Sequence, residues 1–261
     1  MDLLSRALGK LEASADKPYF DAEADGHAAE QYYAGVEPDA GRLGALLTET
    51  HLNKPHYSPA TELYPWVDLQ PDRKVRSVYT LDEYDPAHLI EEAARIHEER
   101  ESLRATAASE AAVEELEPYN CEHVVCQSWF DHAEPMRGDL HHLFTCERKC
   151  NSFRGNAPYT DFPDYLEVVR EACGKKETDV FEPANGKGAV ARATFYFLFR
   201  YAALKPYSND AVATLLAWHE AEPVSEYEHH RNAAVFERQG NRNPFVDHAE
   251  WASQVDFSAL A

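Results

Sequence analysis

The stretch from Tyr119 to Asn156 gathers residue types that can do acid–base and metal chemistry. It reads YNCEHVVCQSWFDHAEPMRGDLHHLFTCERKCNSFRGN. Besides acids such as Glu122 and Asp139, it holds four histidines, four cysteines and the asparagines Asn151 and Asn156; the histidines and cysteines are His123, His132, His141, His142, Cys121, Cys126, Cys146 and Cys150. Neutral imidazole can take a proton from water near pH 7, and carboxylate and amide oxygens suit a cation such as Mg²⁺. Because a cation neutralises charge on a scissile phosphate, the pattern predicts metal-assisted phosphodiester hydrolysis.

Two short strands and a helix are expected to position these residues. Glu122–Val125 has the β-branched character of a strand, and Leu140–Phe144 is similar. A loop with Pro135 and Gly138 separates them. The following residues, CERKCNSFR, suit the start of a helix that Gly155 would end. Such a unit can direct side chains from the first strand and from the helix at a common point.

The Glu122–His123 dipeptide alone is weak support for a site, because adjacent strand residues point to opposite faces. Together with His141, His142 and the polar helix start, it indicates a functional cluster.

Four separate strings of the sequence resemble one protein family. NCEHVVCQSWF, GDLHHLF, NSFRGN and RNAAVFERQGNRNPFVDH are similar to the bacterial endonuclease I family of sugar-nonspecific nucleases, with its ββα-metal (His-Me) finger. The similarity extends from about Tyr32 to about Trp251 and is weakest before Tyr119. Their order and spacing make the resemblance specific.

The resemblance implies roles for individual residues. His123 would be the general base that activates water. Glu122 and Asn151 would bind the divalent cation, Mg²⁺ or another such as Mn²⁺ or Ca²⁺. Arg154 would contact the phosphate or support the metal ligands. Residues expected close to this centre, with weaker support, are His142, His141 and Asp139.

The five cysteines leave three alternatives open. The spacing of Cys121, Cys126, Cys146 and Cys150 resembles a structural zinc site. However, a strand from Cys121 to Cys126 spans about 16 Å at about 3.3 Å per residue, so one four-cysteine site is not favoured. Disulfides are preferred, with Cys146–Cys150 or Cys121 with either of these as the expected pairs, and free thiols remain. Cys126 and Cys146 also replace prolines common in the family, which affects how the finger is stabilised.

The length of 261 residues suits one large domain. We expect an α+β fold that is mostly helical and built around the finger at about 119–156, with an N-terminal extension at 1–20 and a single nuclease domain at 21–256. Expected elements outside the finger are two helices within Asp21–Thr50, a buried strand at YPWVDL, a strand at Lys74–Leu81, a helix at Pro86–Ala112 begun by Asp85, a helix at Tyr165–Ala172 before a Gly/Lys-rich connector, and helices at Asp210–Glu220 and after Ser225.

The apolar run Gly186–Leu204 predicts a central buried helix. Arg192 and Arg200 lie eight residues apart and hence on nearly one helix face. One interpretation pairs these arginines with acids; the other lets Arg192, near the helix start, reach the scissile phosphate as a catalytic residue. Asn241–His248 matches the family, and either bracing of the finger or substrate contact would explain it.

The net charge of −21 argues against a nucleic-acid partner, which normally needs a basic surface. The acids are denser before the finger, however, and a bound cation would add positive charge where the phosphate sits. An acidic exterior also suits a salty habitat, where salt screens the repulsion.

The compartment depends on processing. No apolar run approaches a membrane span, and the first residues lack the apolar core of a secretory signal. The resemblance implies a secreted or periplasmic mature form; a chain complete as printed would be cytoplasmic.

The sequence thus predicts a monomeric, metal-dependent endonuclease that cleaves DNA, and RNA as well, with little sequence preference, leaving 5′-phosphates. The alternative is a catalytically inactive nuclease fold that serves as a binding or zinc-stabilised structural module. The acidic surface and the altered cysteines favour that alternative; the intact Glu122, His123 and Asn151 oppose it.

Overall fold

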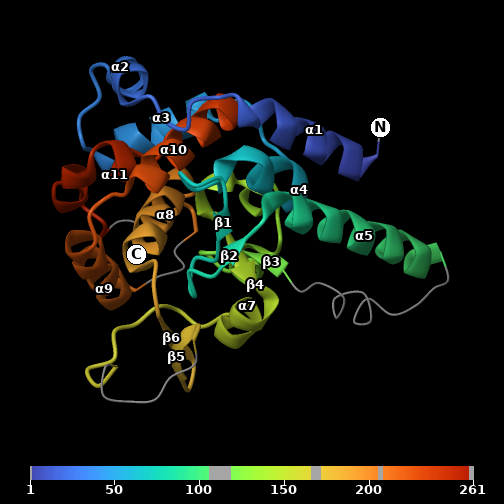
Figure 1. Cartoon of the computed structure of the whole chain (residues 1–261). Coiled ribbons are helices and arrows are strands. Elements are labelled where there is room, and N and C mark those ends of the chain that lie inside the picture. Colours follow the sequence, from blue (N-terminus) through green and yellow to red (C-terminus); the bar gives the residue numbers. More distant parts are fainter. Residues whose placement is uncertain (1, 106–118, 166–171, 205–207, 259–261) are drawn as a thin grey trace.

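The computed structural model describes residues 2–105, 119–165, 172–204 and 208–258 (Figure 1). Within these ranges the chain forms helices and three small antiparallel sheets of two strands each. This mixture agrees with the expected α+β class.

The α-helices are α1 (Leu3–Ala15), α2 (Ala22–Tyr32), α3 (Ala40–Thr50), α4 (Pro59–Glu62), α5 (Pro86–Ala105), α7 (Arg148–Arg154), α8 (Lys187–Arg200), α9 (Asn209–Ala221), α10 (Glu226–Gln239) and α11 (Pro244–Asp247). The strands are β1 (Val75–Arg76), β2 (Glu83–Tyr84), β3 (Tyr119–His123), β4 (Leu143–Glu147), β5 (Gly174–Glu177) and β6 (Val180–Pro183). A π-helical turn, η1, covers Leu63–Val67, and short 3₁₀ turns include η2 (Gln127–Phe130), η3 (Met136–Gly138), η4 (Leu140–His142) and η5 (Ala249–Ser253).

Helix ends follow the local capping signals closely. The two helices expected within residues 21–50 are present as α2 and α3, and the side chains of Asp21 and Asp39 accept hydrogen bonds at their starts. The capping box of Ser225 and Glu228 opens α10, and Gly240, at φ +90°, ends it. The expected start of α9 was wrong by one residue, because Ser208 is the cap.

Two expected strands differ from the structure. YPWVDL forms the π-helical turn η1 instead of a strand. The expected strand at 74–81 shortens to β1, because the chain turns back and Ser77 N donates to Asp82 O, with Leu81 in the left-handed region at φ +64°. The Gly/Lys-rich connector forms the β5–β6 hairpin. The helix expected at 165–172 falls mostly outside the described residues, as does the expected end of α5 at residue 112.

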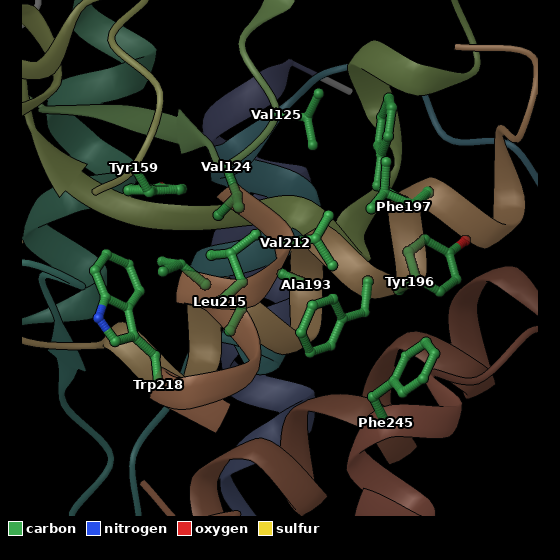
Figure 2. Close-up of a cluster of buried hydrophobic side chains, with 14 of the residues drawn as sticks. Val124, Val125, Tyr159, Ala193, Tyr196, Phe197, Val212, Leu215, Trp218 and Phe245 are labelled. Carbon is green, nitrogen blue, oxygen red and sulfur yellow. The ribbon is translucent and has the colours of Figure 1, made fainter. Parts of the chain in front are cut away.

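The central buried helix predicted between residues 186 and 204 is confirmed as α8. Its side chains are buried on almost every side, and it packs against α3 and α9. Figure 2 shows Tyr196 and Phe197 of α8 among side chains of α9 and of the segment that follows β3, including Val124 and Val125. The finger strands therefore rest directly on the main core.

A second core holds the N-terminal helix in place. Ala7 of α1 is fully buried there, and the amine of Lys10 donates to Thr61 O at 2.7 Å. Ser14 Oγ donates to Pro65 O at 2.8 Å. Much of the segment expected as an extension at 1–20 thus packs against η1, α4 and α5. Among the described residues, no helix combines the length and apolar character needed to cross a membrane.

Candidate active site

Strands β3 and β4 and helix α7 form the predicted strand–loop–strand–helix unit. The strands are antiparallel, with Glu122 opposite Phe144 and His123 opposite Leu143. Both strand predictions were displaced by about three residues: β3 ends at His123, and the residues before Leu143 form the 3₁₀ turn η4. The predicted end of the helix at Gly155 is confirmed.

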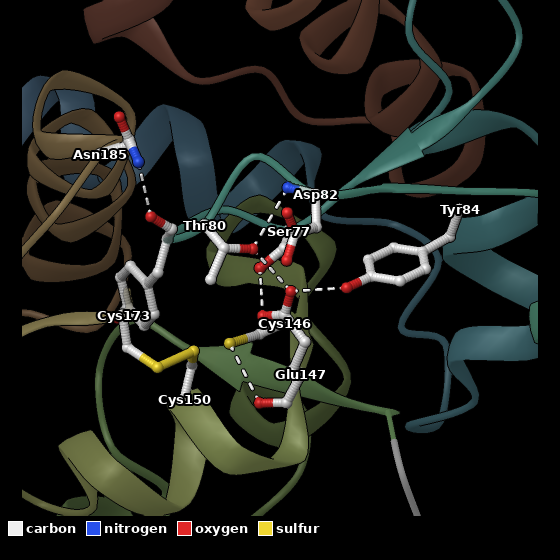
Figure 3. The surroundings of a disulfide bond; sticks show 10 residues. Ser77, Thr80, Asp82, Tyr84, Cys146, Glu147, Cys150, Cys173 and Asn185 are labelled. Carbon is white, nitrogen blue, oxygen red and sulfur yellow. Dashed lines mark hydrogen bonds between the residues drawn. A yellow bond between two sulfur atoms is a disulfide. The ribbon is translucent and has the colours of Figure 1, made fainter. Parts of the chain in front are cut away.

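The start of α7 is fixed by the carboxylate of Glu147, the last residue of β4. It accepts hydrogen bonds from Ser77 Oγ at 2.5 Å, Thr80 Oγ1 at 2.6 Å and Tyr84 OH at 2.7 Å (Figure 3). These donors come from β2 and from the segment that connects β1 to β2. The small β1–β2 sheet therefore fixes the junction from which α7 carries Asn151.

A cavity of about 480 Å³ opens beside the end of β3 and the start of α7. It is lined by Tyr57, Arg100, His123, Cys126, Gln127, Ser128, His132, Arg137, Arg148, Asn151, Ser152, Gly155 and Asn156. His123 and Asn151 thus share one cavity, as predicted. The three arginines give it positive character in a chain of net charge −21. Glu122 is not among the lining residues.

His123 is held as a neutral imidazole with one free nitrogen. Its Nε2 lies 2.9 Å from Arg137 O, and because a carbonyl can only accept, Nε2 carries the proton. Nδ1 is buried and has no hydrogen-bond partner among the described residues. Burial, helped by the neighbouring His142, lowers the pKa of His123 well below its ordinary value. Nδ1 is therefore available to accept a proton near pH 7.

Glu122 points to the other face of β3 and is 1% exposed. Its Oε1 accepts a hydrogen bond from Arg154 Nη1, while its Oε2 is buried with no partner in the described part of the chain. Burial raises the pKa of Glu122, and the charge of Arg154 opposes that rise.

Asn151 lies on α7 and faces β3. Its amide nitrogen donates to Cys121 O, next to Glu122 in the chain, at 3.2 Å. The unpartnered Oε2 of Glu122 and the amide oxygen of Asn151 are hard donors of the kind Mg²⁺ prefers. In the described ranges no three His, Cys, Asp or Glu side chains group to hold a metal, so a Mg²⁺ ion here would keep several waters. The oxygen types suit that kind of ion, although Asn151 lines the cavity and Glu122 does not.

Arg154 lies in the protein interior. It is fully buried, and its guanidinium donates to His123 O at 3.0 Å, Val124 O at 2.8 Å and Ala157 O at 3.2 Å besides Glu122. It does not line the cavity, so a phosphate contact does not fit its position. Arg154 instead ties the end of α7 to β3.

Arg192 is also placed away from the cavity. Its guanidinium binds Glu228 at 2.7 and 3.0 Å and Glu222 O at 2.8 Å, and it is 1% exposed. The structure therefore does not bring Arg192 to His123. Instead, Glu228 on α10 neutralises the charge of Arg192, in agreement with the interpretation that pairs it with an acid. Arg200, expected to pair with an acid, instead donates to His51 Nδ1 and Thr48 Oγ1.

His141 and His142 are buried behind the cavity. His142 Nε2 lies 2.6 Å from Met136 O, and its ring centroid is 5.4 Å from that of His123. His141 Nε2 lies 3.1 Å from Asn241 O, and burial lowers the pKa of His141 to about 4. Neither lines the cavity, so both support the scaffold.

The loop Asn241–His248, which matches the family, also faces inward. Asn241 Nδ2 lies 2.6 Å from Tyr196 OH, and Asn243 Nδ2 donates to Arg192 O at 3.0 Å. Arg242 is fully buried and pairs with Asp247 and Asp25. Of the two interpretations, bracing of the finger fits these contacts.

The cysteine predictions named the wrong partner. Cys150 forms a disulfide with Cys173, which connects α7 to the start of the β5–β6 hairpin (Figure 3). Cys121, Cys126 and Cys146 are buried free thiols. Cys121 lies directly opposite Thr145 in the β3–β4 pair, so their side chains share one face of the sheet. Cys146 follows Thr145 in β4 and therefore projects from the opposite face. With Cys150 already bonded, a zinc site of all four predicted cysteines is ruled out.

Several lining residues were missed by sequence reasoning. Gln127 Oε1 accepts a hydrogen bond from Arg137 Nε at 3.0 Å and lies 3.4 Å from His132 Nδ1. Gln127 thereby holds the side chains of Arg137 and His132 at the cavity. Tyr57 is far away in the sequence, yet its ring lies 5.2 Å from that of His123 and 5.1 Å from the guanidinium of Arg137. The basic residues within the finger were the one available signal.

Comparison with known proteins agrees with this geometry. Residues 41–250 match the family model for endonuclease I. Over 156 residues the chain is 33% identical to an extracellular ribonuclease of Bacillus subtilis, covering 52% of this chain and 54% of that protein. It is 35% identical to an extracellular ribonuclease of Bacillus amyloliquefaciens, with 52% and 53% covered. It is 29% identical to an extracellular deoxyribonuclease of Aeromonas hydrophila, with 45% and 52% covered.

The chain spans about half the length of these curated relatives. The family match, however, covers most of the chain and includes every residue that lines the cavity. This chain belongs to the endonuclease I family.

Proposed function

We propose that this chain is a divalent-metal-dependent endonuclease that hydrolyses phosphodiester bonds of DNA, and of RNA, with little sequence preference. The observation that carries the proposal is the buried, neutral His123, which has an unpartnered Nδ1 and lines one cavity with Asn151 and three arginines. The names of the relatives, ribonuclease and deoxyribonuclease, support both polymers as substrates.

In this mechanism His123 Nδ1 removes a proton from a water molecule, whose oxygen attacks phosphorus in line with the departing 3′-oxygen. Cleavage of that bond leaves a 5′-phosphate. The hydrogen bond from Nε2 to Arg137 O holds the ring while Nδ1 gains the proton, and the carbonyl stabilises the imidazolium that forms.

Positive charge at the cavity holds the phosphate. Arg137 and Arg148 line it, and neither has an ion-pair partner in the described ranges. A Mg²⁺ ion bound by Glu122 Oε2 and the amide oxygen of Asn151 would supply further positive charge for the phosphate and the departing oxygen. This local charge opposes the repulsion that the acidic exterior exerts on a polyanion.

Removing a metal ligand should weaken Mg²⁺ binding and lower the activity at a given Mg²⁺ concentration. We expect the protein to nick supercoiled plasmid in Mg²⁺ and to stop in excess chelator. Asn151→Ala should raise the Mg²⁺ concentration for half-maximal activity by about 10–100-fold. Asn53→Ala, at an exposed asparagine outside the cavity, serves as the control. Full activity in chelator would disprove metal dependence, and a folded protein inactive with every divalent ion would favour the non-catalytic module.

The activity should persist into mildly acidic solution. Only neutral His123 can act as the base, and burial lowers its pKa, so protonation removes activity only well below the ordinary histidine value of about 6.5. The measurement is kcat/KM against pH at several Mg²⁺ concentrations. A midpoint that moves with Mg²⁺ would report protonation of Glu122 rather than of His123. A Mg²⁺-independent midpoint at or above 6.5 would contradict this assignment.

A further inference from the structure

Asp139 ends the η3 turn of the loop between β3 and β4 and is a fully buried carboxylate. Its Oδ2 accepts from Tyr196 OH at 2.8 Å and Tyr201 OH at 2.9 Å. Its Oδ1 accepts from Gln239 Nε2 at 3.0 Å and from the backbone N–H of His141 at 3.1 Å. Four donors thus fix one side chain to α8, to α10 and to η4.

The ionised state of Asp139 suits this role. Burial alone would raise its pKa, but His51, His141 and His142 and the hydrogen bond from Gln239 hold the pKa of Asp139 below its usual range. A carboxylate without a proton can accept from all four donors at once, because each oxygen has two lone pairs.

The turn before Asp139 is the one that contacts His123. Arg137, two residues earlier, supplies the carbonyl that accepts from His123 Nε2 at 2.9 Å. The preceding carbonyl, of Met136, binds His142 Nε2 at 2.6 Å. Asp139 N donates back to Met136 O at 3.3 Å, so the anchor and the two carbonyls form one turn.

The turn has little room to move. A Cβ added to Gly138 would lie 1.9 Å from Pro55 O, so the backbone at this residue packs directly on the segment before Tyr57. The amide of Gly138 also donates to Glu134 Oε2 at 3.0 Å. Gly138 directly precedes Asp139, so this packing and the hydrogen bonds of Asp139 together hold the C-terminal end of the turn.

The hydrogen bond to Arg137 O decides the tautomer of His123. Among the described residues it is the one hydrogen bond of that ring, since Nδ1 has no partner there. If the carbonyl moves away, nothing in its described surroundings favours a proton on Nε2 over Nδ1. A ring with its proton on Nδ1 has no lone pair there with which to deprotonate water.

We propose that Asp139 is a positioning residue for His123. Through the η3 turn it keeps Arg137 O where it holds the proton of His123 on Nε2, so that Nδ1 keeps its lone pair and stays a free base. Tyr196, Tyr201 and Gln239 act through Asp139 as its outer supports. The catalytic consequence depends on the proposed nuclease function, whereas the control of the tautomer does not.

Two variants test this chain of contacts. Asp139→Asn replaces one acceptor oxygen by an NH₂ group, so two donors lose their partner. Tyr201→Phe removes one donor and keeps the ring, which packs 4.7 Å from that of Phe197. The matched control is Tyr33→Phe, because Tyr33 is also buried and its hydroxyl donates to another buried carboxylate, Asp247, at 2.9 Å.

The first measurement is the tautomer of His123 by ¹⁵N NMR of histidine-labelled protein, with the signal assigned by its loss in His123→Gln. Wild type and Tyr33→Phe should show the Nε2–H form alone. Asp139→Asn should show a mixture with the Nδ1–H form, and Tyr201→Phe a smaller shift in the same direction. This readout requires folded protein but no nuclease activity.

The second measurement separates kcat from KM on DNA. We expect Asp139→Asn to lower kcat about 10–100-fold, as loss of a group supporting a catalytic ligand does, with KM within about twofold. Tyr33→Phe should leave kcat unchanged even where it lowers the melting temperature. Wild-type tautomer and kcat in folded Asp139→Asn would overturn the proposal. Should that variant fail to fold, an unchanged tautomer in Tyr201→Phe overturns the proposal. A shifted tautomer in the variants, together with a wild type that does not cleave DNA, would refute the nuclease function alone.

Discussion

His123→Ala lowers kcat for DNA cleavage by about 10²–10⁴-fold and leaves KM within a few-fold of wild type. General-base catalysis contributes about this much, and the variant removes the base without touching the arginines that hold the phosphate. Cleavage of a fluorescent oligonucleotide at saturating Mg²⁺ measures both constants. Added imidazole should restore part of the rate, because the substitution leaves space beside the cavity.

His132→Ala is the matched control, since that second imidazole lines the same cavity but is exposed and is held through Gln127. We expect a much smaller loss from it. Equal losses in both variants would show that histidine content, rather than the buried base, limits the rate. Near wild-type kcat in His123→Ala would remove His123 as the base altogether.

Features coded by neighbouring residues were predictable. The capping box of Ser225 and Glu228, the stop at Gly240 and the order of strands and helix in the finger each depend on a few consecutive residues. The pattern also indicated that His123 and Asn151 face one site, and both line the same cavity. Local propensity and spacing were sufficient there.

Features that depend on distant partners were not predictable. Cys150 bonds Cys173, 23 residues away, because the β5–β6 hairpin returns to α7. His230 of α10 places its nitrogens 2.6 Å from Tyr19 O and 2.9 Å from Trp66 O. Neither contact has a local signature, since both require the folded arrangement of segments far apart in the chain.

The roles of the arginines show the same limit most clearly. The sequence left two roles open for Arg154 and for Arg192, a phosphate contact or support of an acid, and in the structure they pair with the buried carboxylates of Glu122 and Glu228. Arg137 and Arg148 line the cavity instead. An arginine's charge is visible in the sequence, but whether an acid neutralises it is decided by tertiary packing.

Arg154→Met should destabilise the fold by about 3–5 kcal/mol, the range for breaking a buried ion pair by removing one partner. It leaves Glu122 charged and uncompensated in a site 1% exposed, and it removes the donor for the carbonyls of His123, Val124 and Ala157. Urea unfolding followed by circular dichroism measures the loss. Arg238→Met is the control, because that arginine pairs with Glu62 at a partly exposed position, where the expected loss is at most about 1 kcal/mol.

The double variant Glu122→Gln with Arg154→Met separates the two causes of that loss. If the unpaired charge dominates, neutralising Glu122 should recover a large part of the stability lost in Arg154→Met. If the three carbonyls dominate, the double variant should be no more stable than the single one. A loss below about 1 kcal/mol in Arg154→Met would show that Glu122 takes up a proton at little cost. The buried pair would then contribute little to holding α7, and with it Asn151, against the strand that carries His123.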